Sequence, residues 1–207
     1  KGGAVMIHCR LANRPEDISA IRVATGECDA LIGGDLVVSA GAKTLGLTTL
    51  GRTKAVVNSH EIITGDFTRN ADFKLPTDQL SLSLEARLKE GFSQFDASEL
   101  SRVMLGDSIF SNMMVFGAAW QKGMIPLSLD AILRSIELNS AAVEGNKRAF
   151  ALGRWASVDP DHAQAMITQK IVPLPKSSEE KIAQRETHIA QYQNRHLRKS
   201  LWLCLIQ

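Results

Sequence analysis

Short apolar runs alternate with helix-like patterns along the first half of the chain, and this alternation constrains the fold most strongly. The runs are Asp29–Gly33, Lys54–Asn58 and Phe92–Phe95. Strands that alternate with helices pack as a parallel sheet covered by helices, and short apolar strands are typical of a sheet buried on both faces. We therefore predict a three-layer, mainly parallel α/β domain, Rossmann-like but incomplete, with a helical C-terminal half.

The N-terminal stretch predicts one more strand. Lys1, Gly2 and Gly3 lead directly into the largely apolar run Ala4–Ala12. A glycine pair that feeds a strand marks a place where the backbone comes close to another group. Nothing that precedes the pair in this sequence could supply that group. We therefore expect the chain to be a piece of a larger protein.

Helix-start signals lie between and after the predicted strands. Asp35 is expected to cap a helix that runs to about Leu45, and a second helix is predicted over Thr77–Glu90. The tetrapeptide Asp96-Ala97-Ser98-Glu99 is an acidic version of the capping box, and it should open a helix to about Leu105. These helices supply the crossover connections that parallel strands need.

The pattern from Asp107 onward is entirely helical. Asp107 should cap a helix over Ser108–Lys122, and apolar residues cover most of its circumference, which predicts that it is buried. Ser128 opens a helix with one apolar stripe, and a further helix is predicted over Ala141–Trp155. The second half should therefore form a helical layer or bundle against the sheet.

Composition narrows the possible partners. Hydrophobic residues make up 44% and charged residues 22% of the chain, and the net charge of +2 is too small to indicate nucleic acid or an anionic membrane. No apolar run reaches the roughly 18 residues that a spanning helix needs. The three cysteines are far apart and form no Cys-x-x-Cys motif, so the chain carries no iron–sulfur or zinc signature. A sparse, odd cysteine count suits a cytoplasmic protein.

Ligands of open parallel sheets bind off the carboxyl ends of the strands, and that rule selects three groups here. The first is Gly33-Gly34-Asp35, and the second is Asn58-Ser59-His60-Glu61 together with the loop Thr64–Arg69. The third is Asp96. Any site on this chain is therefore expected at this edge of the sheet.

Each of these candidates has a plainer interpretation. His60 follows a strand and could act as an acid, a base or a hydrogen-bond donor, or it could merely bind loop backbone. Glu61 and Asp66 could hold a cation, although most loop acids are solvated or cap a helix. Gly33-Gly34 lacks the third glycine of the dinucleotide fingerprint and also fits a tight strand-to-helix turn. The residues alone leave these alternatives open.

A series of motifs, in order from Lys1 to about Trp155, resembles the gamma-type catalytic domain of 2-oxoacid:ferredoxin oxidoreductases. The pattern is most similar to the indolepyruvate ferredoxin oxidoreductase branch. The motifs are Lys1–Met6, Pro15–Ile18, Gly51–Asn58, His60-Glu61, Thr64–Arg69, Leu105–Ile109, Asn112-Met113, Ala119–Gly123, Ile136–Asn139, Val143-Glu144, Asn146-Lys147, Ala149-Phe150 and Gly153.

The resemblance implies an enzyme that oxidatively decarboxylates aryl pyruvates with thiamine diphosphate. It would pass the electrons to ferredoxin through iron–sulfur clusters and form an aryl-acetyl-coenzyme A. The family pattern places thiamine diphosphate, its Mg²⁺ and the 4Fe-4S clusters in other domains, so we expect this chain to bind no cofactor. The family's first strand and its Gly-x-Gly-Gly-x-Gly loop would precede Lys1.

The resemblance also implies a domain organisation and a set of partners. We expect a gamma-type domain over residues 1–157, truncated at its N-terminus, then a linker over 158–176 and a C-terminal helix over 177–207 that leads to a further domain. Expected partners are the remaining domains or subunits of an oligomeric enzyme, with ferredoxin and coenzyme A acting on the whole. No metal ligand and no catalytic residue is assigned. Residues expected to face substrate or coenzyme A are Lys1, Gly2, Gly3, Asn58, His60, Arg69 and Asn112.

Two other function classes stay open at this stage. One is a nucleotide-binding, Rossmann-like domain that acts alone, and it is disfavoured because this sequence contains no glycine-rich phosphate cradle. The other is a non-catalytic structural interface module, which the sequence does not distinguish from a scaffold domain of the oxidoreductase.

Overall fold

The computed structural model describes residues 4–60, 77–169, 182, 183 and 185. The chain divides into two compact units, Lys1–Lys170 and Ile171–Gln207. Only three residues of the second unit are described, and all three are helical. The expected C-terminal helix over 177–207 therefore stays a prediction.

Three parallel strands form the sheet of the first unit. They are β1 (Ala30–Gly33), β2 (Lys54–Asn58) and β3 (Phe92–Phe95), in the spatial order β1-β2-β3. Leu31 pairs with Ala55 on one side of β2, and Asn58 pairs with Phe95 on the other. The predicted parallel α/β fold is confirmed, and the strand limits match the sequence to within one residue.

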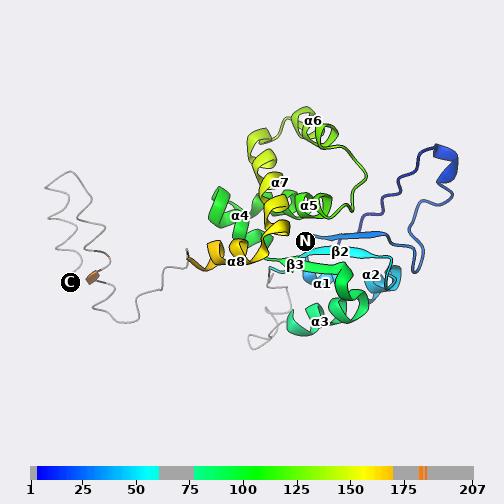
Figure 1. The fold of residues 1–207 in the computed structure, drawn as a ribbon, viewed down its shortest axis with the longest axis horizontal. Coiled ribbons are helices and arrows are strands. Elements are labelled where there is room, and N and C mark those ends of the chain that lie inside the picture. The colour runs from blue at the N-terminus through cyan, green and yellow to red at the C-terminus, as the bar shows by residue number, and fades with distance from the viewer. Residues whose placement is uncertain (1–3, 61–76, 170–181, 184, 186–207) are drawn as a thin grey trace. The chain divides into compact units, whose positions relative to one another are not determined.

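Helices cover both faces of the sheet, which completes the three layers (Figure 1). On one face, α1 (Leu36–Ser39) and α3 (Thr77–Leu88) pack against Ala55 and Val57. The opposite face presents Val56 to a second cluster. Ala55 and Val57 thus face one side of the sheet and Val56 the other, because successive side chains of a strand point to opposite faces. The helices behind Val56 are α4 (Ala97–Leu105), α5 (Ser111–Gln121), α7 (Val143–Val158) and α8 (Pro160–Gln169).

Close backbone packing joins α5 to α7. A Cβ added at Gly117 would clash with the carbonyl oxygen of Phe150, and one added at Gly153 would clash with that of Met114. Only glycine permits this approach. The helix α6 (Leu129–Asn139) adds Ile132 to the same region, where a third cluster forms around Phe150. The predicted helical half is thus a tightly packed layer.

The strand predicted over Ala4–Ala12 is wrong. Residues 4–14 form no regular element, and residues 4–29 make an extended arm with one 3-10 turn at Pro15–Asp17. The side chains of Val5 and Ile7 are 75% and 80% exposed. A strand needs a neighbouring backbone for its hydrogen bonds, and no strand of the described residues pairs with this segment.

Two predicted helices are interrupted. The helix from Asp35 divides into α1 and α2 (Ala42–Leu47), because Gly41 between them has extended backbone angles. The helix from Asp107 begins as a 3-10 turn over Ser108–Phe110 and becomes α-helical only at Ser111. In both cases the aspartate caps the first turn, as predicted.

Part of the predicted linker is also helical. Residues 160–169 form α8, with proline at its first position, where the missing N–H costs nothing. Ala163 and Ile167 of α8 are buried against the sheet-side helices, and the ring of His162 lies 5.8 Å from that of Trp155. Buried side chains at i and i+4 give α8 an apolar face that extends the domain beyond residue 157.

Candidate functional site

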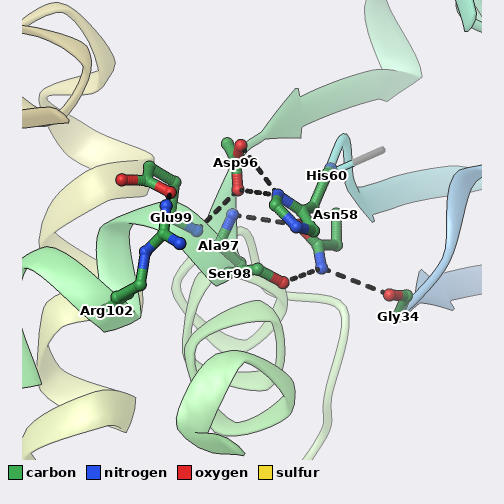
Figure 2. Close-up of polar contacts among 8 residues, drawn as sticks. All are labelled: Gly34, Asn58, His60, Asp96, Ala97, Ser98, Glu99 and Arg102. Atoms are coloured by element: carbon green, nitrogen blue, oxygen red, sulfur yellow. Dashed lines mark hydrogen bonds and ion pairs between the residues drawn. The ribbon is translucent and has the colours of Figure 1, made fainter. Parts of the chain in front are cut away.

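The carboxyl ends of the three strands meet at one edge of the sheet, because all three are parallel. Asn58, the last residue of β2, pairs with Phe95, the last residue of β3. The residues that follow the strands are therefore neighbours in space: Gly34 after β1, His60 after β2 and Asp96 after β3 (Figure 2). This edge is where ligands of open parallel sheets bind.

Asn58 is the buried centre of this edge. Its side chain amide donates to the Ser98 hydroxyl at 2.9 Å and to the Gly34 carbonyl at 3.3 Å. Its amide oxygen accepts the backbone N–H of Ala97 at 3.0 Å and that of His60 at 3.2 Å. The residue is only 2% exposed. One side chain therefore ties the end of β1, the start of α4 and the His60 backbone together.

Asp96 has two roles at this edge. Its carboxylate accepts the backbone N–H of Glu99 at 2.7 Å, which caps α4 as the sequence predicts. The same carboxylate lies 3.1 Å from the His60 Nδ1 through each of its oxygens. The capping box is closed on one side only, because the Glu99 carboxylate pairs with Arg102.

The contact with Asp96 determines the chemistry that His60 can offer. An ionised carboxylate only accepts hydrogen bonds, so the Nδ1 of His60 must donate and carries a proton. In the neutral ring the other nitrogen, Nε2, is then the proton acceptor. The His60 and Asp96 side chains are 37% and 30% exposed. The side chain that Nδ1 contacts is thus the carboxylate of Asp96.

Asn112 lies at the same edge, at the start of α5. A Cβ added at Gly34 would lie 3.1 Å from the Asn112 amide oxygen, which places the two residues side by side. At Gly33 the added Cβ would clash with the Ser39 side chain. The Gly33-Gly34 pair is thus a tight strand-to-helix turn. It offers no phosphate cradle, because the Asp35 carboxylate already accepts from the first turn of the short α1.

Three of the seven candidate residues are brought together: Asn58, His60 and Asn112. The other four, Lys1, Gly2, Gly3 and Arg69, lie outside the described residues, as do Glu61 and Asp66. Sequence reasoning missed Ser98. Its position inside the Asp96–Glu99 capping box was the only available signal, and nothing local shows that it faces Asn58.

The described residues do not fit an iron–sulfur cluster. Within the described ranges no three His, Cys, Asp or Glu side chains gather in a way that could hold a metal ion. Cys9 is exposed, and burial raises the pKa of the Cys28 thiol, which donates to the Ala30 carbonyl at 3.2 Å. A diphosphate does not fit the start of α4 either, because the Asp96 carboxylate already occupies it.

None of the helices in the described ranges combines the length and the apolar character needed to cross a bilayer.

The fold and this edge define the class of protein: an α/β domain whose polar residues gather off the carboxyl ends of a parallel sheet. Residues 1–156 match the family model described as pyruvate ferredoxin/flavodoxin oxidoreductase, and the chain belongs to that family. The resemblance to 2-oxoacid:ferredoxin oxidoreductases is thereby confirmed at the level of the family. Neither the curated proteins nor the solved structures give a significant match.

Family membership indicates a general activity for the enzyme to which the chain contributes. Members oxidise 2-oxoacids with ferredoxin as acceptor, within enzymes that contain further domains or subunits. The chain is therefore one part of such an oxidoreductase.

Proposed function

We propose that the chain is a domain of a cytoplasmic, thiamine-diphosphate-dependent oxidoreductase that converts aryl pyruvates such as indolepyruvate to aryl-acetyl-coenzyme A. In this proposal thiamine diphosphate, Mg²⁺ and the 4Fe-4S clusters belong to other domains. The domain serves as scaffold and presents the carboxyl edge of its sheet to the oxoacid or to coenzyme A. The observation that carries the proposal is the convergence of Asn58, His60 and Asn112 at that edge within a member of this family.

Arg69 is proposed to supply the positive charge at the rim. Arginine binds carboxylate or phosphate through a bidentate fork, and both the oxoacid and coenzyme A carry such groups. The sequence connects Arg69 to β2 through the segment that starts at His60. We assign His60 and Arg69 to one rim for that reason.

The test uses the complete oxidoreductase with Arg69→Ala and His60→Ala, and it measures the KM values for indolepyruvate, pyruvate and coenzyme A. Either variant should raise at least one KM severalfold. Arg134→Ala is the control, since this exposed α6 side chain pairs with Glu137 at 3.0 Å on another part of the domain. Unchanged constants in both variants would leave the loop a structural role. Turnover of pyruvate without turnover of indolepyruvate would contradict the proposed specificity for aryl pyruvates.

A second experiment tests the division of labour between domains. The purified 207-residue chain, supplied with indolepyruvate, coenzyme A, ferredoxin and thiamine diphosphate, should give no turnover above a boiled control. Activity of the chain alone would contradict the proposed location of the cofactors.

One observation favours the alternative of a structural interface module. The arm over residues 4–29 exposes several large apolar side chains, among them Ile21 at 92%. An oxidoreductase whose KM and kcat values do not respond to any change at the carboxyl edge would support this second function.

A further inference from the structure

We propose that His60 is the proton acceptor for the thiol of coenzyme A, with Asp96 and Asn58 as its positioning residues. The inference rests on the proposed function, because it takes coenzyme A as a substrate at the carboxyl edge. It deepens that function by assigning a chemical step to one atom, the Nε2 of His60. It uses described residues only.

Asp96 fixes the orientation of the His60 imidazole. Both oxygens of the Asp96 carboxylate lie 3.1 Å from Nδ1, so that nitrogen is held as the donor (Figure 2). The proton-accepting lone pair is then on Nε2. A carboxylate that holds the far nitrogen of a histidine in this way fixes the tautomer of a general base and stabilises the imidazolium that forms.

The Asp96 carboxylate is itself held in place. Asp96 is the N-cap of α4, where it accepts the Glu99 N–H at 2.7 Å. Asn58 joins the start of α4 to the His60 backbone through a single amide oxygen, which accepts from Ala97 and from His60. The acceptor and its orienting group therefore belong to one hydrogen-bonded network, although they come from two different strand ends.

The charges around His60 suit its role as a proton acceptor. Asp96 offsets the positive charge of a protonated His60, and the same carboxylate already occupies the positive end of the α4 helix. The other charged side chain at this helix start, Glu99, is paired with Arg102. With its positive charge offset by Asp96, His60 is suited to accept a proton from a neutral X–H group. The thiol is the X–H group of coenzyme A whose deprotonation creates a nucleophile.

The proposed step balances in atoms and charge. The S–H bond of coenzyme A breaks, its proton forms an N–H bond at Nε2, and the electron pair stays on sulfur as a thiolate. The His60 imidazolium is left paired with the Asp96 carboxylate. No oxidant or reductant is needed.

The test measures the coenzyme A-dependent half of the reaction in the complete oxidoreductase as a function of pH. General-base catalysis contributes about 100-fold or more, so His60→Gln should slow this half-reaction about 100-fold at pH 7 and leave the affinity for coenzyme A within about twofold. The deficit should shrink toward high pH, because free thiols ionise near pH 8.5 without help. A purely structural role would not give this rescue.

Two further variants separate orientation from capping. Asp96→Asn keeps a good N-cap residue but removes the carboxylate, so it should slow the step about tenfold with the same rescue by pH. Asp107→Asn is the matched control, since the Asp107 carboxylate caps the next helical turn, where it accepts the Ile109 N–H at 3.0 Å, and it should leave the rate unchanged.

Each outcome decides the question. A half-reaction that His60→Gln leaves unchanged, or slows equally at every pH, overturns the role of His60 while coenzyme A stays a substrate at this edge. If the oxidoreductase neither binds nor consumes coenzyme A, the proposed function fails and this inference fails with it.

Discussion

The N-terminal arm and the α5–α7 pair contain similar apolar residues, but the arm exposes them and the helix pair buries them. The arm, residues 4–29, exposes 80% of Ile7 and 92% of Ile21. In the helix pair, Met114 and Phe150 are at most 1% exposed. A helix forms its backbone hydrogen bonds within itself, whereas a strand needs a partner strand that only the assembled sheet can provide. This explains why an apolar run forms a regular element in one region and not in the other.

The glycines of the chain also fall into two groups, one in turns and one within helices. Gly26 of the arm and Gly106 at the end of α4 serve turns with positive φ values of 74° and 85°. Gly117 and Gly153 lie within helices, where glycine has no local advantage and is retained for the approach of the two backbones. Packing, and not conformation, explains the helical glycines.

The largest expected effect on stability comes from an added side chain at the close contact between α5 and α7. Gly153→Ala forces a methyl group into the Met114 carbonyl, so we expect it to lower the free energy of unfolding by about 3 kcal/mol. Gly46→Ala in α2 is the control, because an added Cβ there meets nothing within 4 Å, and it should be neutral or slightly stabilising. Urea denaturation measures both. Equal stability of the two variants would show that α5 and α7 do not approach this closely.

A smaller effect is expected at the site edge. Asn58→Ala leaves the Ser98 hydroxyl and the Ala97 N–H without their buried partner, at a cost of about 2 kcal/mol. Asn146→Ala is matched to it, since that side chain makes one exposed bond to the Ala141 carbonyl, and it should cost less than about 0.5 kcal/mol. Denaturant midpoints that do not separate the two variants would contradict the central role of Asn58.

A weaker, pH-dependent effect should distinguish packing from charge in the helical half. Hydrogen bonds from Lys147 at 2.8 Å and Arg134 at 3.0 Å lower the pKa of Glu137, which links α6 to α7. A carboxyl whose pKa is lower in the folded chain stabilises the fold above its unfolded pKa, and this contribution is lost as the pH falls. The advantage of the native chain over Glu137→Gln should therefore shrink from pH 6 to pH 3. Salt should reduce it as well, because the pair is exposed.

The smallest effect is expected in the arm. Ile7→Ser and Ile21→Ser should each change the free energy of unfolding by less than about 0.5 kcal/mol, because neither side chain leaves water on folding. Ile132→Ala in α6 removes a buried side chain and should cost about 3 kcal/mol. A large loss from either arm variant in the isolated 207-residue chain would mean that the arm packs against something.

The pattern of residues predicted much of the fold because much of it is local. The predicted limits of β2 and β3 match the structure to the residue, since short apolar runs end at clear turn signals. The caps at Asp35, Asp96 and Ser128 were also predicted, because a side chain that accepts from an N–H three residues later acts within one turn. The candidate edge followed from the rule for parallel sheets, and Asn58 and His60 were named by it.

The order of residues alone therefore predicts most of the elements, the fold class and the family to which the chain belongs. The tertiary structure alone decided that Ala4–Ala12 is not a strand, that Gly41 separates two helices and that Asp96 faces His60. Asp96 and His60 are 36 residues apart, and Asn58 and Ser98 are 40 apart. Contacts of that separation depend on the register between β2 and β3, and no pattern within one segment encodes that register.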